Sequence, residues 1–404
     1  MKRSWLLFLA VIGPGLVVML ADTDVGSIIT AAQSGAVWGY KLLTAQLILI
    51  PILYIAQELT VRLGVCTKKG HGELIKEKFG TKWAWLSVGT LLVSCVGAIA
   101  TEFSGIAGVG NLFHISPYIS VGLAVIFLAA IVLTGSYLTV ERVAIVLGLF
   151  ELAFFVVVWK AHPSFSPVWD GIKNVPWHSS SYLYLLAANI GAVIMPWMVF
   201  YQQSAVVDKG LDKPKLKMAR WDTAVGAIIT QLIMSSVLMA TAATIGKHNP
   251  GAPLDTVQQL SQALTEYLGK DTGVILYSMG MLGAAMVSAI VVSLTAAWGL
   301  GEVTGYKRSL SSKPRQAPWF YVVYAAILLI GALIVFSGVN LISLNIGVEV
   351  MNALLLPIVL TFLYLLAIKT LPKGERLSGK YAWIVGIILF ITAAFGVYGG
   401  IVGF

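Results

Sequence analysis

The sequence is poor in charged residues. Only 11% of its 404 residues are Asp, Glu, Lys or Arg, whereas soluble domains carry about 25%. A water-facing surface cannot be built from so few charges, and 58% of the residues are hydrophobic. The 40 glycines and 12 tryptophans agree with this, because Gly is frequent within membrane helices and Trp collects at membrane interfaces. The composition therefore excludes an ordinary soluble protein and predicts a polytopic membrane protein.

Residues that many enzymes depend on are also scarce. The two cysteines, Cys66 and Cys95, lack the C-x-x-C spacing of metal ligands. None of the five histidines falls within an expected span, and neither H-E-x-x-H nor G-x-x-x-x-G-K-[ST] occurs. We therefore expect no enzyme activity, no cofactor and no ATP-driven pumping by this chain.

Eleven apolar segments are long enough to cross a bilayer, which takes about 20 residues per helix. No connection between them is long enough for a separate domain, so we expect one transmembrane domain over residues 1–404. Within the longest connections, the residues around 255–260 have the pattern of a capped surface helix. The expected spans are 5–36, 40–66, 83–113, 118–137, 141–160, 182–207, 219–246, 271–303, 318–338, 343–368 and 380–402.

The placement of Lys and Arg predicts the orientation of these spans. With the N-terminus in the cytoplasm, 22 of the 27 basic residues fall on the cytoplasmic side. An eleven-span chain then has its C-terminus outside, and the net charge of +9 reflects cytoplasmic loops and not a nucleic-acid surface. The five basic residues on the outer side are Lys41, Lys160, Lys173, Lys247 and Lys270.

The spans divide into two sets of five, over about 5–160 and about 182–368, with an extra helix at about 380–402. Because five is odd, the second set enters the membrane in the opposite sense to the first. This is the inverted repeat of many secondary transporters, whose sites lie at discontinuous helices in matching positions of the two halves.

The first span of each half, span one and span six, carries helix-weakening residues near its middle. Span one contains Gly-Pro-Gly at 13–15 and Asp-Thr-Asp-Val-Gly-Ser at 22–27, and span six contains Pro196 after Gly191. Proline removes a backbone donor, and unwound backbone at membrane depth is tolerated only where it is buried in protein or lines a cavity. We therefore expect spans one and six to be broken. A simple proline kink in each helix is the alternative.

Five carboxylates fall deep within apolar spans, while all 27 basic residues lie in loops or near span ends. Each buried charge costs about 2.5–3.5 kcal/mol at the bilayer centre, so a mobile cation or a proton has to supply the missing charge. Neutral, hydrogen-bonded carboxyls are the alternative, for Glu151 above all. The five are Asp22, Asp24, Glu102, Glu151 and Glu349.

Two further residues accompany these carboxylates. Asn352 lies one helical turn after Glu349, which places two polar groups on one face. Met195 lies beside the expected break of span six, where a thioether is a soft ligand that favours transition metals. Packing is the alternative role for Met195.

These motifs resemble the NRAMP family of divalent metal transporters. Residues 12–40 resemble that family's first helix, with G-P-G, D-P-G-N and Q-A-G-A-x-x-G-Y at the same spacing, and residues 57–64 resemble the end of its second helix. Residues 191–205 resemble its sixth helix, G-A-x-x-M-P-H followed by Y-x-H-S-A. The resemblance covers most of the chain. It implies an all-α, APC-superfamily-like fold of eleven transmembrane helices, a 5+5 inverted repeat with broken helices one and six plus one extra helix.

The resemblance also implies a metal site. The residues that match the ligands of the family are Asp24, Ser27, Ala192 through its carbonyl, Met195 and, in place of a helix-ten glutamine, Glu349. Glu102 resembles the acidic residue of the family's third helix. The expected neighbours that relay charge or gate this site are Asp22, Glu102, Glu151, Trp197 and Asn352.

Three departures from the family pattern affect the expected cargo. The Pro and Asn of D-P-G-N are Val25 and Ser27, and the histidine that the family links to proton coupling is Trp197. Loss of an amide and gain of a carboxylate favour a harder ion such as Mg²⁺ or Mn²⁺, whereas Met195 favours Mn²⁺ and Fe²⁺. Because Trp197 stands where the family has its coupling histidine, we expect weak proton coupling or none.

The sequence thus predicts a secondary transporter of a divalent metal in the plasma membrane, working by alternating access. Its partners would be the lipid bilayer and the metal, with no nucleic acid, and the protein would be a monomer. The alternative keeps the fold but carries a small organic solute, such as an amino-acid-like compound, coupled to H⁺ or Na⁺.

Overall fold

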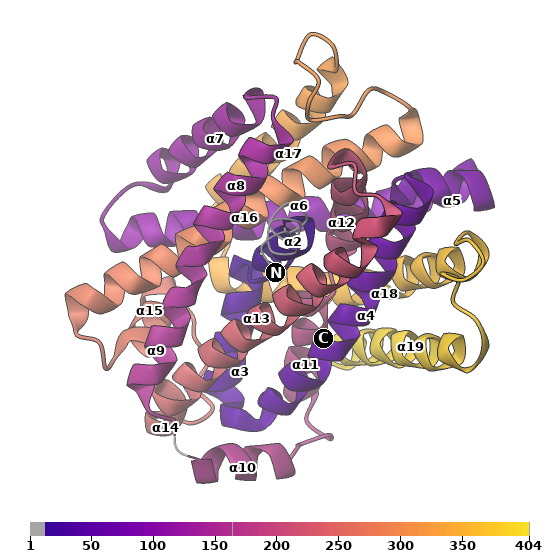
Figure 1. Cartoon of the computed structure of the whole chain (residues 1–404). Helices are drawn as coiled ribbons and strands as arrows, with labels where there is room; N and C mark the ends of the chain where they lie inside the picture. Colours follow the sequence, from indigo (N-terminus) through magenta and orange to yellow (C-terminus); the bar gives the residue numbers. More distant parts are fainter. Residues whose placement is uncertain (1–12, 164, 404) are drawn as a thin grey trace, which may run out of the picture.

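The computed structural model describes residues 13–163 and 165–403, and these form helices with no strand among them (Figure 1). The helices of the first half are α2 (Pro14–Asp22), α3 (Val25–Trp38), η1 (Gly39–Leu42), α4 (Leu43–Thr67), α5 (His71–Phe79), α6 (Thr81–Leu112), α7 (Pro117–Leu133), α8 (Tyr137–Gly148), η2 (Leu149–Leu152), α9 (Ala153–Ala161) and α10 (Phe165–Lys173). Those of the second half are α11 (Ser180–Val193), α12 (Pro196–Asp208), η3 (Lys213–Lys215), α13 (Leu216–Ala243), α14 (Ile245–His248), α15 (Val257–Thr265), α16 (Lys270–Thr304), α17 (Pro318–Phe336), α18 (Leu341–Lys369) and α19 (Gly379–Val402).

Nine helical runs of the described residues are long and apolar enough to cross a membrane. One of them, Val25–Thr67, has 43 residues, about twice the length that one crossing needs, and η1 divides it into α3 and α4. The apolar helix α7 has 17 residues and is just shorter than the nine. Eleven crossings are compatible with these lengths, and the number stays a prediction. The expected start of span one, 5–12, lies outside the described residues.

Both expected breaks are confirmed. α2 ends at Asp22 and α3 begins at Val25, with Asp24 in an extended conformation between them. In the second half α11 ends at Val193 and α12 begins at Pro196. Ile194 and Met195 are extended there, so Pro196 starts a helix, where its missing N–H has no partner to lose.

Glycines bring α11 into direct contact with two other helices. A side chain on Gly191 would overlap the carbonyl oxygen of Glu349 on α18, and one on Gly399 of α19 would lie 2.5 Å from the carbonyl oxygen of Leu183. Figure 1 shows α18 and α19 side by side along one flank of the bundle. Small residues at membrane helix interfaces allow this approach of one backbone to another.

Short helices cover the two ends of the bundle. The predicted capped helix is α15, in which Thr256 accepts a hydrogen bond from the Gln259 N–H and the Gln259 side chain accepts one from Thr256 N–H. α10 lies at one end of the bundle and α5 near the other (Figure 1). We call the end that carries Arg62, Lys209 and Arg220 the basic end.

Candidate cation site

Asp24 lies at the start of α3, inside the break of the first span. Its Oδ1 accepts a hydrogen bond from the Ser27 N–H at 2.7 Å, and its Oδ2 has no partner among the described residues. The side chain is fully buried. A helix N-terminus carries a partial positive charge, so the fold supports this carboxylate on one side and leaves one oxygen available to a ligand.

The breaks of the two halves meet at Ser27. Its hydroxyl donates a hydrogen bond to the carbonyl oxygen of Ala192 at 2.9 Å, across 165 positions of sequence. Ala192 lies in the last turn of α11, and Met195, in the break that follows, is also buried. An aspartate, a hydroxyl, a carbonyl and a thioether are therefore supplied from the two broken helices.

Glu349 approaches the first break from α18. Its Oε1 lies against Gly26, where any side chain would overlap it, and this oxygen has no hydrogen-bond partner among the described residues. Its Oε2 accepts a hydrogen bond from Asn352 at 3.0 Å, and Asn352 accepts one from Ser94 at 2.7 Å. The Asn352 amide therefore orients the carboxylate and leaves Oε1 free toward the break.

Glu102 lies on the α6 side of the same break. Its Oε2 accepts a hydrogen bond from the backbone N–H of Val25 at 3.3 Å, the residue after Asp24. Trp197, at the position of the family's coupling histidine, is fully buried, and no hydrogen bond to its indole N–H is found in the described structure. The tryptophan fills space at the start of α12 and has no group that accepts a proton.

Asp22 and Glu151 take no part in these hydrogen bonds, although Asp22 lies within electrostatic range of Asp24 and Glu349. Asp22 ends α2 and faces Thr230 and Gln231 of α13, and Glu151 lies in η2 and faces Thr23. All four carboxylate oxygens are without hydrogen-bond partners in residues 13–163 and 165–403. None of the five deep carboxylates forms an ion pair within this part of the chain.

The described residues contain no group of three or more His, Cys, Asp and Glu side chains that could hold one metal ion. The predicted ligand set is of another kind, since Asp24 and Glu349 are its only carboxylates and the rest is hydroxyl, carbonyl and thioether. Oxygen ligands suit hard divalent ions and the thioether adds a preference for softer ones. The set has charge −2 when both carboxylates are ionised, which matches one divalent cation.

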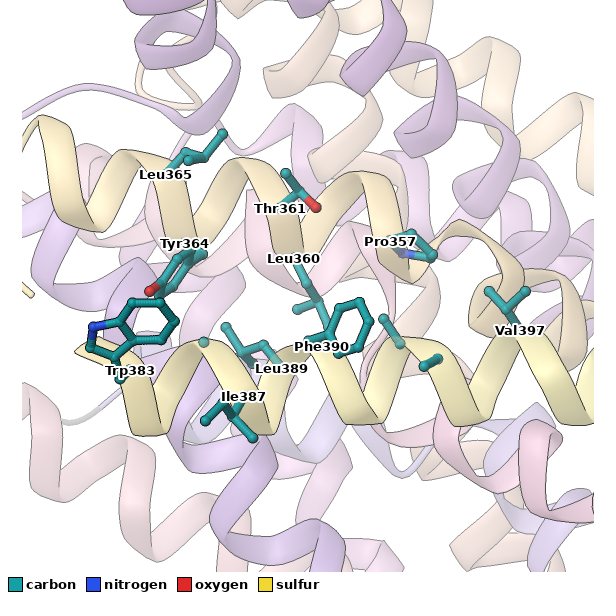
Figure 2. Close-up of a pocket in the computed structure, with 13 residues that line it drawn as sticks. Pro357, Leu360, Thr361, Tyr364, Leu365, Trp383, Ile387, Leu389, Phe390 and Val397 are labelled. Atoms are coloured by element: carbon teal, nitrogen blue, oxygen red, sulfur yellow. The ribbon is translucent and has the colours of Figure 1, made fainter. Parts of the chain in front are cut away.

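A spacious cavity lies elsewhere. It has a volume of about 640 Å³ and opens between α18 and α19. In Figure 2, Tyr364 and Trp383 lie together at one end of it and Phe390 lies beside Leu360. Its lining is almost wholly apolar, so this cavity offers a cation no charged ligand.

The sequence prediction, which considered the deep carboxylates, missed several uncharged polar residues of the core. Gln231 and Thr230 lie within the expected span 219–246, and Ser94 lies within 83–113. All three are buried. Uncharged polar residues inside an apolar span also indicate a buried polar site. They are a weaker signal than a carboxylate, because the hydroxyls of Ser and Thr can donate hydrogen bonds to the backbone carbonyls of their own helix.

The described structure is a helical bundle with many apolar spans, two broken helices in contact, and buried carboxylates that form no ion pairs. These features together are those of a multi-pass membrane transporter, and not of an enzyme. The chain matches the Nramp family, described as natural resistance-associated macrophage protein-like, over residues 15–401, and it belongs to that family.

Relatives and solved structures agree in fold. The chain is 26% identical over 297 residues to the divalent metal cation transporter MntH of Klebsiella pneumoniae, covering 71% of this chain and 70% of that protein. It is similar to the Eremococcus coleocola manganese transporter, with a TM-score of 0.75, 18% identity, and coverage of 99% and 88%. A Na⁺-coupled sialic acid symporter gives a TM-score of 0.63 at 14% identity, covering 96% and 88%.

Proposed function

We propose that this chain carries a divalent metal cation across the membrane by alternating access. The ligands would be Asp24, Ser27, the carbonyl of Ala192, Met195 and Glu349. The observation that carries the proposal is the hydrogen bond from Ser27 to Ala192, because it joins the two breaks beside two carboxylate oxygens that lack partners. The names of the curated relatives, divalent metal cation transporters, support the same cargo.

The choice of metal follows from the ligand chemistry. Two carboxylates, a hydroxyl and a carbonyl suit Mn²⁺ and Mg²⁺, while the thioether of Met195 gives Mn²⁺ and Fe²⁺ an additional interaction. An anionic organic solute fits this lining poorly, because no basic side chain of the described structure reaches the deep carboxylates.

The neighbours of the ligands have supporting roles in this proposal. Glu102 would relay charge, since it contacts the backbone next to Asp24, and Asn352 would hold Glu349 in place. Trp197 would gate the site from the start of α12. The two repeats, about 5–160 and 182–368, would move relative to one another and open the site to each side of the membrane in turn. The protein would lie in the plasma membrane with its basic end facing the cytoplasm, and it would work as a monomer.

The experiment is metal uptake by proteoliposomes that contain wild type or Asp24→Ala. We expect the variant to lose Mn²⁺ uptake while it still folds, because the alanine removes the charged ligand inside the break. Asp255→Ala, an exposed carboxylate, is the matched control and should transport normally. Near-normal uptake by Asp24→Ala would refute the site.

A further inference from the structure

Asp22 and Glu151 form a second pair of carboxylates that the proposed metal site does not use. Asp22 is the last residue of α2, and Glu151 lies in the short 3₁₀ turn η2 between α8 and α9. Both are 1% exposed or less. Glu151 lies within electrostatic range of Asp22, and none of their four oxygens has a hydrogen-bond partner in the described structure.

Gln231 provides an independent observation at the same place. It faces Asp22 from α13 and is fully buried. Neither its amide oxygen nor its amide nitrogen has a hydrogen-bond partner within the described residues. A buried amide without partners costs free energy, and a cation bound at Asp22 would give the Gln231 amide oxygen a partner.

Two hydroxyls complete the surroundings. Thr23, between Asp22 and Asp24, forms a hydrogen bond of 2.5 Å with Thr230, the neighbour of Gln231 on α13. This bond connects the break of the first span to α13. Glu151 also lies beside Thr23. The first break, α13 and η2 therefore enclose a group of oxygen atoms and contain no sulfur or imidazole ligand among the residues named.

This group adjoins the proposed metal site, since Asp22 lies within electrostatic range of Asp24 and Glu349, but the side chains of Asp22, Glu151 and Gln231 form no hydrogen bond with its proposed ligands in the described structure. The Asp24 carboxylate accepts its hydrogen bond from Ser27 of α3, and Glu102 contacts the same break from α6. The Asp22 carboxylate meets α13 instead. The carboxylate of Asp24 is thus surrounded by α3 and α6, and the carboxylate of Asp22 lies beside α13.

We infer that Asp22, Glu151 and Gln231 form a second cation site, which takes an alkali cation such as Na⁺. The inference goes beyond the proposed metal transport and does not depend on it. The ligands are all oxygens, which hard cations prefer. Mg²⁺ gives up its water reluctantly, and so fits a fully buried site of few ligands less well than an alkali cation does.

The test is the thermal unfolding of the purified protein in NaCl, KCl or choline chloride at equal ionic strength. A cation that binds only the folded state raises the unfolding temperature. We expect Na⁺ or K⁺ to raise it relative to choline. In Glu151→Gln, the concentration for half of this shift should increase by roughly tenfold or more, since weaker second-sphere changes already cost 10–100-fold in metal sites.

Gln231→Leu keeps a similar volume without the amide, and should weaken the alkali shift as well. It decides the matter if Glu151→Gln does not fold. Glu302→Gln alters a buried carboxylate whose partners are Gly72 and Ser204, and should keep the full shift. The inference is overturned if no alkali cation stabilises the wild type, if only Ca²⁺ does so, or if the shift survives in both Glu151→Gln and Gln231→Leu.

A fourth variant separates this inference from the proposed function. Asp24→Asn should lose stabilisation by Mn²⁺ and keep stabilisation by the alkali cation, whereas Glu151→Gln should show the reverse. If the wild type gains nothing from Mn²⁺, the proposed metal site fails while the alkali site stands. If only the alkali shift is absent, the second site fails alone.

Discussion

Met195 would be the one soft ligand in a site of oxygens. It is fully buried and lies in the break directly before α12. A thioether interacts better with Mn²⁺ than with Mg²⁺, so Met195→Ala should weaken Mn²⁺ binding more than Mg²⁺ binding. Calorimetric titration of both ions into wild type and variant measures this difference.

Met198 is the matched control for this substitution, because it is an equally buried methionine of α12 that lies one turn beyond the break. Met198→Ala should affect both ions alike, through packing only. If Met195→Ala also lowers the two affinities by the same factor, Met195 packs against its neighbours and binds no metal.

His71 is a buried histidine outside the membrane spans, at the start of α5. Its ring lies 3.0 Å from the amide oxygen of Gln203 and packs edge-on against Phe200. Burial lowers the pKa of His71 to about 4, below the 6.5 of a free histidine. The folded protein therefore holds the neutral ring at neutral pH.

Because the unfolded chain binds the proton more tightly, the stabilisation from His71 is complete above pH 6.5 and is lost as the pH falls toward 4. The full loss is roughly 3 kcal/mol. His71→Gln should flatten the dependence of the unfolding temperature on pH in this window, whereas His178→Gln, at an exposed position, should not. Equal slopes in wild type and His71→Gln would contradict the assignment.

Asp222 of α13 fixes the beginning of α2. Its Oδ2 accepts hydrogen bonds from the backbone N–H groups of Gly13 at 3.2 Å and Gly15 at 2.8 Å. The first N–H groups of a helix have no partner within that helix, so this carboxylate caps α2 from another helix. The same short helix ends at the candidate cation site.

Asp222→Ala should therefore loosen α2. Since a hydrogen bond to a carboxylate contributes about 1.5–3 kcal/mol, amide hydrogen exchange in 15–18 should become roughly tenfold faster or more. Hydrogen-exchange mass spectrometry of that peptide measures the change. Glu266→Ala removes an exposed partner of His248 and should leave α2 unaffected; unchanged exchange in Asp222→Ala would show that other contacts hold the helix.

The helix breaks were predictable because their causes are local. Pro196 and the glycines around Asp24 weaken the helix wherever they occur. The cap of α2 was not predictable in this way, since Asp222 and Gly13 are 209 positions apart. The 3₁₀ turn that holds Glu151 also has no Gly or Pro in residues 149–152 to announce it.

The charges of the whole molecule were partly predictable. The sequence shows that the deep carboxylates have no basic residue near them along the chain, and the ion pairs found among the described residues do not involve them. It does not show how these carboxylates divide between Asp24 with Glu102 and Asp22 with Glu151. That division depends on how three helices pack around the first break, which a one-dimensional pattern does not contain.

Across the membrane, we expect metal movement to be weakly coupled or uncoupled to protons. Trp197 has no titratable group at the position of the family's histidine, and Glu102 is the remaining relay candidate beside the site. A pH-sensitive dye inside proteoliposomes, under an inward metal gradient with the voltage clamped, should report little acidification. Metal-dependent acidification that disappears in Glu102→Gln would reverse this expectation and make Glu102 the proton relay.

The direct backbone contact between α11 and α18 limits which distances change during transport. Gly191 lies against the Glu349 backbone and directly precedes Ala192, so we expect these two proposed ligands to keep their separation during transport. Asp24 and Ser27 belong to the other half of the molecule. We therefore expect Ala192 and Glu349 together to set the ionic radius that the proposed site accepts, and an ion to be released when Asp24 and Ser27 move away from them.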